Sequence, residues 1–516
     1  MAIGEQPSLL LITLADVAAY GVRCLASYVR QQGFQTDILC LRLSDSRKRR
    51  LHPQSAGKIS DHLINRVVSF IAPYDVIGIS LFSDGINQSI ALTKAIKKSY
   101  PDKKIIWGGI HPTLKPHDCL AYADFVCVGE GYYSLVGLLK HLSSNHWADF
   151  AKLPPGIWAK ESGGTFIENG SSEMCTDLDT LPFPLYDGNA FFVRTNKNTI
   201  INLDRQGYHK YLDYAYSTMI SQGCPNSCSY CCNYALKKVN KGYARIRKHS
   251  IDYTLREIQA AAGHYQFYNV HFMDDSFLSM GEDDFEEFIK RYPKEIGLPF
   301  NVVGLIPRLT QPHHVDQLIN AGMVYGQIGV QTGSRKMLDI YHRKQSNAEI
   351  IHVSEMFAKH KGRVAPLGVD IILDGYRETI GDTIQTVRLL SQIKRPFILN
   401  LNALISYPGT KIAEHMNGDA PGGSFFNYKS SVVNNLIALI YLIKIPDKIL
   451  FWLIERKKLM NCKIPSTITK LIYYGTLSKK TISYIYHRSY NNIPTRVVDV
   501  VRALRMEDKK SDFHLI

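Results

Sequence analysis

The chain has 516 residues, of which 45% are hydrophobic, and it carries a formal net charge of +15. This size predicts a globular protein with about three domains. The N-terminus, MAIGEQPSLLLITLAD, has neither the basic start nor the cleavage site of a secretory signal, so we expect a cytoplasmic protein. The apolar stretch LIALIYLIKIPDKILFWLI is interrupted by charges and a proline, and it falls short of the ~20 apolar residues of a membrane span. Ten cysteines spread over a long intracellular chain argue against a disulfide framework.

The first 145 residues alternate short apolar runs with helical stretches. The runs are LLLITL, TDILCL, YDVIGISLF, KKIIWGG and DFVCVGEG. This order predicts an α/β domain with a Rossmann-like parallel sheet wrapped by helices.

Small and polar residues follow three of these predicted strands. Ligands bind at the carboxyl ends of strands in open parallel sheets, and glycine lets a backbone approach a ligand closely. A ligand site and a set of ordinary tight turns both fit this pattern. The residues concerned are Ser80, Gly108, Gly109, His111, Gly129, Glu130 and Gly131.

The rest of the chain divides into three further segments. Residues 146–210 read as a linker, and residues 211–415 alternate six strand signals with helices. This second alternation predicts a partial (β/α)6 barrel, in which the chemistry lies at the carboxyl ends of the strands. Residues 416–516 read as a helical, basic region; from 424 onward they hold 16 Lys and Arg against 6 Asp and Glu.

Three cysteines form a C-x3-C-x2-C motif directly after the first predicted barrel strand. Cys224, Cys228 and Cys231 lie within eight residues, so their thiolates can converge on one iron–sulfur cluster. Four irons served by three thiolates leave one iron open to another ligand. A structural zinc site that uses Cys232 is the alternative, but the usual second C-x2-C pair is not found in the sequence.

This motif resembles that of the radical S-adenosylmethionine (SAM) superfamily. Further matching pieces follow in order, namely FMDDSF at 272–277, GVQTGS at 329–334, Glu378-Thr379 and YPGT at 407–410. The GGIHPT and VGEGY strand ends and the LDTLPFPLYD segment resemble the subgroup with a cobalamin-binding domain in front of the barrel. The resemblance covers roughly residues 8–415.

The resemblance implies roles for residues of the second domain. The three cysteines hold a 4Fe-4S cluster whose open iron binds SAM, and an electron from the cluster cleaves SAM to a 5′-deoxyadenosyl radical. Asp274 or Asp275 stands where an acidic partner for the SAM ammonium is expected, although a turn or helix cap also explains them. The other implied cofactor contacts are Tyr230 near the adenine, Arg308 near the carboxylate, and Gln331, which replaces the more usual glutamate.

The resemblance also implies that cobalamin binds at the strand ends of the first domain. Cobalamin-binding folds often carry D-x-H-x-x-G after their first strand, with the histidine on cobalt. Here the run is DVAAYG, with Ala18 in place of the histidine. We therefore expect cobalamin without a histidine ligand from this loop, and His111 to contact the corrin or its tail or to cap a turn.

The implied function is methylation of an unactivated carbon of a small-molecule or lipid-like substrate. Ring formation or rearrangement without methyl transfer is the alternative in the same subgroup. A transfer RNA methylthiotransferase and a non-catalytic cobalamin or redox sensor fit less well, and we do not expect a nucleic-acid partner. The expected partner is an electron donor such as flavodoxin or ferredoxin. The apolar and basic tail fits either helices that lie on an anionic membrane surface or a helical cap over the barrel mouth, and the cap is the favoured interpretation.

Overall fold

The computed structural model describes residues 6–14, 17–41, 60–144, 149–161, 163–195, 197–212, 214–373, 375–404 and 406–416. These residues fall into two compact units. The first unit takes the described residues within Met1–Pro225, Tyr230–Phe267 and Ser406–Phe425, and the second takes Asn226–Ser229 and those within Tyr268–Ile405. The predictions for the basic tail, including its membrane contact, concern residues outside this described part of the chain.

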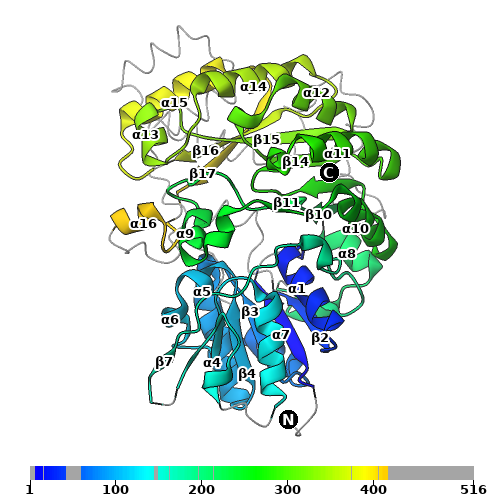
Figure 1. Cartoon of the computed structure of the whole chain (residues 1–516), viewed down its shortest axis with the longest axis vertical. Helices are drawn as coiled ribbons and strands as arrows, with labels where there is room; N and C mark the ends of the chain where they lie inside the picture. Colours follow the sequence, from blue (N-terminus) through cyan, green and yellow to red (C-terminus); the bar gives the residue numbers. More distant parts are fainter. Residues whose placement is uncertain are drawn as a thin grey trace. The chain divides into compact units, whose positions relative to one another are not determined.

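A sheet in the order β7-β6-β5-β4-β3-β1-β2-β8-β9 forms the centre of the first unit (Figure 1). Its strands are β1 (Leu9–Thr13), β2 (Thr36–Cys40), β3 (Val76–Ser80), β4 (Lys104–Gly108), β5 (Phe125–Cys127), β6 (Ile157–Lys160), β7 (Phe166–Ile167), β8 (Ala190–Arg194) and β9 (Thr199–Asn202). The core β2-β1-β3-β4-β5 is parallel throughout. Its order changes direction between β1 and β3, and open α/β sheets bind ligands at such a switch point.

Helices cover both faces of this sheet, which explains why its central strands are apolar on both sides. The helices are α1 (Tyr20–Gln31), α3 (Asp61–Phe70), α4 (Ile86–Ser99) and α7 (Gly131–Leu142). Helix α1 packs with α7, and α3 packs with α4. Ile77 and Trp107 are fully buried in the core, and the Trp107 indole donates a hydrogen bond of 3.0 Å to Thr93. Burying each large apolar side chain contributes about 1.5–3 kcal/mol.

The segment 146–210, expected as a linker, supplies four strands of this sheet. Strands β6 and β7 extend the sheet beyond β5, and both are antiparallel. Strand β8 pairs in parallel with β2, and β9 pairs antiparallel with β8. These strands are two to five residues long, so their apolar patterns are too short to stand out in the sequence.

The second unit is built on five parallel strands that pair in chain order. They are β13 (Asn269–Phe272), β14 (Phe300–Leu305), β15 (Met323–Gln331), β16 (Leu367–Leu373) and β17 (Phe397–Ala403). Buried and half-buried residues alternate along β15, so one face of this strand is covered and the other is more open. Together with β10 (Ala215–Thr218) of the first unit, all six expected strands are present, and the α/β fold class is confirmed.

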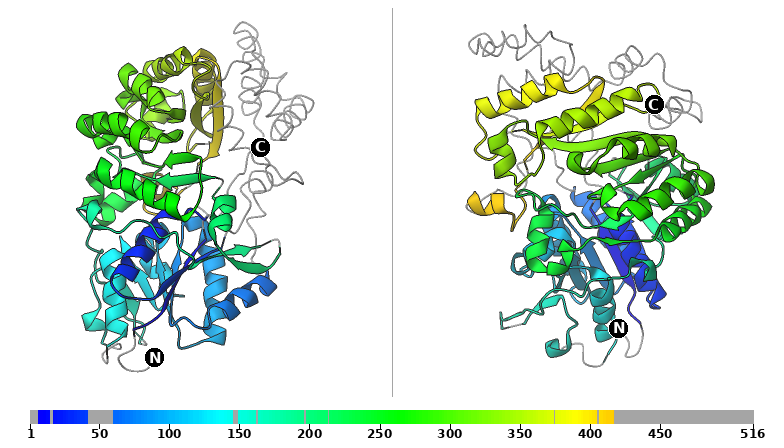
Figure 2. Two further views of the ribbon diagram at one scale, coloured as in Figure 1. Left: turned by 90° about the vertical axis from the view of Figure 1, so that its right-hand side faces the viewer. Right: turned by 45° about the horizontal axis from the view of Figure 1, so that its top comes forward.

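Helices cover one face of the strands of the second unit (Figure 2). They are α11 (Glu282–Glu295), α12 (Pro312–Asn320), α13 (Arg335–Ile340), α14 (Asn347–Lys359) and α15 (Ile380–Gln392). Capping boxes begin α14, between Ser346 and Glu349, and α15, between Thr379 and Asp382. Among the described residues, no helix combines the length and apolarity that crossing a bilayer needs.

Candidate functional site

The carboxyl ends of β3 and β4 bring several of the predicted cobalamin residues together. Ser80 and Gly108 are register partners, and Leu81 donates a backbone hydrogen bond of 3.0 Å to Gly108. Gly109 has a φ of 97°, and a Cβ there would lie 2.9 Å from the Leu81 carbonyl oxygen. Only glycine fits this turn without strain. The edge therefore presents backbone rather than side chains.

His111 lies beside this edge at the start of α5 (Ile110–Leu114) and is 9% exposed. Its Nδ1 is 2.9 Å from the Ser83 hydroxyl. Burial lowers the pKa of His111, so the neutral imidazole is favoured. His111 is thus fixed in position by Ser83 and by the turn at Gly109.

The loop after β1, where a cobalt-binding histidine is often found, is held by a buried arginine. Arg23 is fully buried, and its guanidinium donates hydrogen bonds to the carbonyls of Val17, Ala18 and Leu185. Its charge also lies 4.3 Å from the centre of the Tyr186 ring. These contacts satisfy a charge that would otherwise be costly to bury.

In the VGEG turn after β5, the side chain of Glu130 is bound by other residues of the first unit. The Glu130 carboxylate forms an ion pair with Arg247 and accepts a hydrogen bond of 3.1 Å from the backbone N–H of Cys175. The two side chains of the pair are only 10% and 12% exposed. Glu130 therefore joins α7 to β12 (Arg247–Lys248), while Gly129 and Gly131 flank it in the turn.

Two of the three motif cysteines belong to the first unit. Cys224 and Cys231 are half-buried, as is Tyr230, and the loop that contains them runs from β11 (Ser221–Gln222) to α9 (Cys232–Val239). Lys237 of α9 donates a hydrogen bond of 2.7 Å to the Cys224 carbonyl.

Helix α9 lies beside α5, which follows the Gly108-Gly109 turn (Figure 1). The YPGT segment is also close to α9, because a Cβ on Gly409 would lie 3.2 Å from that of Ala235. Burial raises the pKa of Tyr407 to about 12, and Cys231 and Cys232 contribute to this increase. Within the first unit, the helix that follows the cysteine loop thus lies next to α5, the helix that follows the predicted cobalamin residues Gly108 and Gly109.

Cys228 belongs to the second unit and is 7% exposed. The four cysteines of the CPNSCSYCC stretch form no disulfide, and soft thiolates are the ligands that iron–sulfur clusters use. The donor set of the loop therefore fits the predicted cluster.

The acidic residues after β13 differ in exposure. Asp274 is 2% exposed, whereas Asp275 is exposed. Gly304 of β14 has a φ of 76°, and a Cβ there would lie 2.1 Å from the Asp274 carbonyl oxygen. This close approach of two backbones fixes the turn that contains both aspartates.

The two remaining predicted contacts also differ in exposure, because Gln331 is half-buried and Arg308 is exposed. Gln331 ends β15 with a φ of 68°, an uncommon conformation for a residue with a side chain. Such strained residues cluster at functional sites. Arg308 lies exposed in the short helix Pro307–Leu309 after β14.

A stripe of polar side chains, not predicted from the sequence, crosses β15, β16 and β17. The Asp370 carboxylate accepts hydrogen bonds of 2.7 Å from the Gln327 amide and 2.9 Å from the Asn400 amide. Burial raises the pKa of Asp370, although these two amides and Arg343 act in the opposite direction. One signal was available, because polar residues interrupt the apolar runs VDIIL and ILNLNA.

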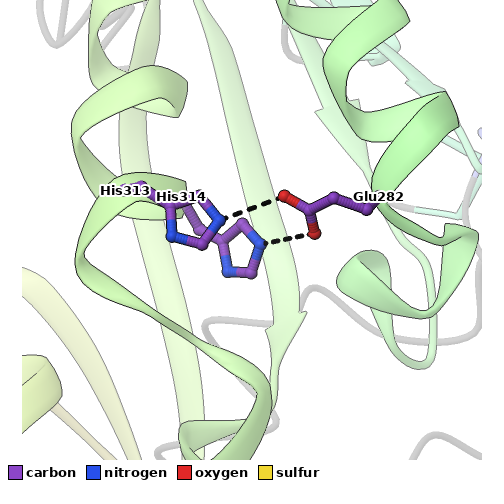
Figure 3. A group of neighbouring side chains, drawn as sticks. All are labelled: Glu282, His313 and His314. Atoms are coloured by element: carbon purple, nitrogen blue, oxygen red, sulfur yellow. Dashed lines mark hydrogen bonds and ion pairs between the residues drawn. The ribbon is translucent and has the colours of Figure 1, made fainter.

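Glu282, His313 and His314 form the one group of three among the described residues whose possible metal-binding atoms all lie within 4.8 Å of one another (Figure 3). The Nε2 atoms of His313 and His314 lie 3.1 and 3.2 Å from the Glu282 carboxylate oxygens. However, Nδ1 of His314 accepts a hydrogen bond from the backbone N–H of Gln311, so the proton of the neutral ring sits on Nε2. Nε2 then donates to Glu282 and has no lone pair for a metal. We interpret the group as a cap that joins α11 to α12.

Two parts of the chain match models of known protein families. Residues 218–390 match the profile of the radical SAM superfamily, and residues 10–139 match that of the B12 binding domain. The chain belongs to the radical SAM enzymes that carry a cobalamin-binding domain. Its cofactors are therefore a 4Fe-4S cluster, SAM and cobalamin, as the sequence predicted, and the zinc alternative is set aside.

Among characterised proteins, the chain is similar to bacteriochlorophyllide d C-8(2)-methyltransferase of Chlorobaculum tepidum. The two are 21% identical over 369 residues, which span 70% of this chain and 72% of the relative. The fold is similar to that of the radical SAM methyltransferase TsrM from Kitasatospora setae, with a TM-score of 0.60, 15% identity, and coverage of 80% and 77% of the two chains. It is also similar to the cobalamin-dependent radical enzyme OxsB, with a TM-score of 0.61, 14% identity, and coverage of 97% and 78%.

Proposed function

We propose that this enzyme methylates an unactivated carbon of a small-molecule or lipid-like substrate, with Cys224, Cys228 and Cys231 as the ligands of its cluster. The observation that carries the proposal is the contact between α9 and α5 within the first unit. It places the segment that follows Cys231 beside the segment that follows Gly109. Transfer of a methyl group between cofactors and substrate requires such closeness. The methyltransferase among its relatives supports the same reaction.

In this reaction the cofactors supply the radical and the methyl group, and the protein binds and orients them. The thiolates of the loop hold the cluster, and the backbone at Gly109 lets the corrin approach the sheet edge. The Asp370 carboxylate, with Gln327 and Asn400, offers a fixed polar surface inside the second unit. Reduction of the cluster is assigned to an electron carrier of the flavodoxin or ferredoxin class.

The test is anaerobic reconstitution of the full chain with iron, sulfide and cobalamin, followed by reduction in the presence of SAM. We expect the native chain to form 5′-deoxyadenosine and S-adenosylhomocysteine. Cys228→Ala should form neither, because two thiolates cannot hold the cluster. Cys232→Ala is the matched control, since this neighbouring cysteine lies outside the motif and should retain both products.

The substrate is sought with SAM that carries a deuterated methyl group, incubated with a small-molecule extract and separately with a lipid extract. A labelled product in one extract identifies the substrate class. Release of 5′-deoxyadenosine with substrate consumption but without label transfer would instead support ring formation or rearrangement. If a loaded native chain forms no 5′-deoxyadenosine, the radical reaction itself is refuted.

A further inference from the structure

The residues around Cys228 hold this cysteine firmly in the second unit. The backbone N–H of Ser229 donates a hydrogen bond of 3.0 Å to the Tyr341 carbonyl. Its hydroxyl donates another, of 2.6 Å, to the Ile340 carbonyl. Both carbonyls lie at the end of α13, and Ser229 is 1% exposed. The position of Cys228 is therefore fixed by two hydrogen bonds on the next residue.

A guanidinium group lies against the sulfur of this cysteine. Nη1 of Arg343 is 3.6 Å from Cys228 Sγ, within the range of an N–H···S hydrogen bond. Nη2 donates hydrogen bonds of 2.6 Å to the Gly329 carbonyl and 2.8 Å to the Gln345 side-chain oxygen. The Gln345 amide in turn donates a hydrogen bond of 2.8 Å to the Val330 carbonyl.

These hydrogen bonds to protein groups fix the orientation of the guanidinium. The guanidinium is planar, so two hydrogen bonds on Nη2 also determine where the N–H bonds of Nη1 point. Gln345 is 5% exposed and attached to the end of β15, which makes it a rigid support. Arg343 is thus held so that it donates to Cys228 Sγ.

A positive donor at a cluster thiolate affects the two redox states of the cluster unequally. One-electron reduction adds a negative charge to the cluster, and the guanidinium stabilises this added charge. Hydrogen bonds to the sulfurs are among the factors that set the potentials of iron–sulfur clusters. Charge-assisted hydrogen bonds are about twice as strong as neutral ones. The expected effect is a cluster that accepts an electron more easily.

We propose that Arg343 raises the reduction potential of the cluster through its hydrogen bond to Cys228 Sγ, so that a low-potential electron carrier protein can reduce it. The electron comes from the carrier, which is oxidised, and enters the cluster, which is reduced. The proposal rests on the assignment of Cys228 as a cluster ligand. It makes Arg343 a positioning and tuning residue that acts through the sulfur.

The experiment is an anaerobic redox titration of the reconstituted full chain without SAM, followed by electron paramagnetic resonance. Arg343→Gln removes the charge, and we expect its midpoint potential to fall by at least the 59 mV that corresponds to a tenfold change in the reduction equilibrium. Arg343→Lys keeps the positive charge but lacks the planar guanidinium with its two terminal nitrogens. Its midpoint potential should therefore lie between those of the native chain and Arg343→Gln. Arg335 is an exposed arginine paired with Asp339, so Arg335→Gln is the matched control. Its midpoint potential should equal that of the native chain.

Iron and sulfide contents are measured for every variant. Arg343→Gln with a full cluster and the native midpoint would overturn the proposal. The proposal would also be overturned if Arg343→Gln kept the native midpoint potential but bound SAM more weakly, because the guanidinium would then bind the SAM carboxylate. If Arg343→Gln assembles no cluster, Gln345→Met provides the test, since it loosens the arginine without removing it. A full cluster at the native midpoint in that variant also overturns the proposal.

Failure of the cysteine assignment gives a different result. In that case Cys228→Ala would retain a cluster with the native spectrum and full iron content. The Cys228→Ala variant thus tests the assignment of Cys228 as a cluster ligand, and the Arg343 variants test the effect of Arg343 on the potential.

Discussion

The strand ends of the first unit and the strands of the second unit present different chemistry. At the edge of the first sheet, Gly108 and Gly109 expose backbone, and the acidic side chain of the nearby Glu130 is engaged by Arg247. In the second unit, the charged side chain of Asp370 lies in β16, and that of Arg343 contacts Cys228 of the cysteine loop. A large, rigid macrocycle needs space and a close backbone, whereas an iron–sulfur cluster and a small charged cofactor need polar or charged side chains around them.

The largest effect is expected from Asp370→Asn. The amide would place a donor opposite the Gln327 or Asn400 amides, which now donate to the carboxylate. Loss of such a charged hydrogen bond costs about 2–3 kcal/mol, roughly a hundredfold in affinity. If the polar stripe across β15, β16 and β17 takes part in SAM binding, this change should weaken SAM binding by this factor and leave cobalamin binding unchanged, as measured by calorimetry on the reconstituted protein. Asp339→Asn, on the exposed face of α13, is the control, and equal loss of both cofactors would break the contrast between the two units.

The stability of the protein should depend on pH through Glu257, which is not among the predicted cofactor contacts. This residue of α10 (Ile251–His264) is 1% exposed and accepts hydrogen bonds from Tyr20, Tyr216 and Thr218. Burial raises the pKa of Glu257 from 4.5 to about 7. Between these two values the folded chain keeps a proton that the unfolded chain has released, so the free energy of unfolding falls as the pH rises.

The expected fall between pH 5 and pH 8 is about 2 kcal/mol. Glu257→Gln should remove this part of the pH dependence, because glutamine does not titrate. Urea unfolding of the cofactor-free native chain and of the variant at both pH values measures the difference. If the two proteins respond to pH in parallel, the carboxyl does not titrate as its burial implies.

A smaller effect is expected from Gly109→Ala. The added Cβ would meet the Leu81 carbonyl oxygen at 2.9 Å and would have to adopt a φ of 97°. Strain of this kind costs of order 1–3 kcal/mol, and we expect cobalamin affinity to fall about tenfold. SAM binding should not change, which is the reverse of the Asp370 result. Gly263→Ala, in α10 with no atom within 4 Å of the added carbon, is the matched control.

The smallest effect is expected from Arg308→Ala. Arg308 is exposed, and an exposed charge contributes about 0–1 kcal/mol to an interaction in water. We therefore expect SAM affinity to change by less than about threefold. A loss of tenfold or more would instead support Arg308 as a partner of the SAM carboxylate and would add a charged contact in the second unit.

The sequence predicts the features that depend on local order. The cysteine spacing, the six strands and the glycine turns can be read because neighbouring residues define them. Pairings between distant residues cannot be read in this way, and Glu130 meets a partner 117 positions away. The ion pair of Glu130 with Arg247 therefore could not be predicted from the sequence, and the contact of Glu130 with cobalamin stays a prediction.

The polar residues of the second unit were missed for a related reason. Asp370 and Asn400 lie inside strands, and only the pairing of β16 with β17 places them side by side. Arg343 follows a short helix and is connected to Cys228 by folding alone, over 115 positions. A search for polar residues that interrupt apolar strands would have found Asp370 and Asn400, whereas no local pattern marks Arg343.

The hydrogen bonds of Arg23 have a consequence for protein engineering. They reach the carbonyls of Val17 and Ala18 and leave the side chain at position 18 out of the network. Ala18→His would therefore bring an imidazole to the loop while its backbone stays anchored. This single exchange would test whether a histidine at this position can bind cobalt, because the cobalamin spectrum of the variant can be compared with that of the native chain.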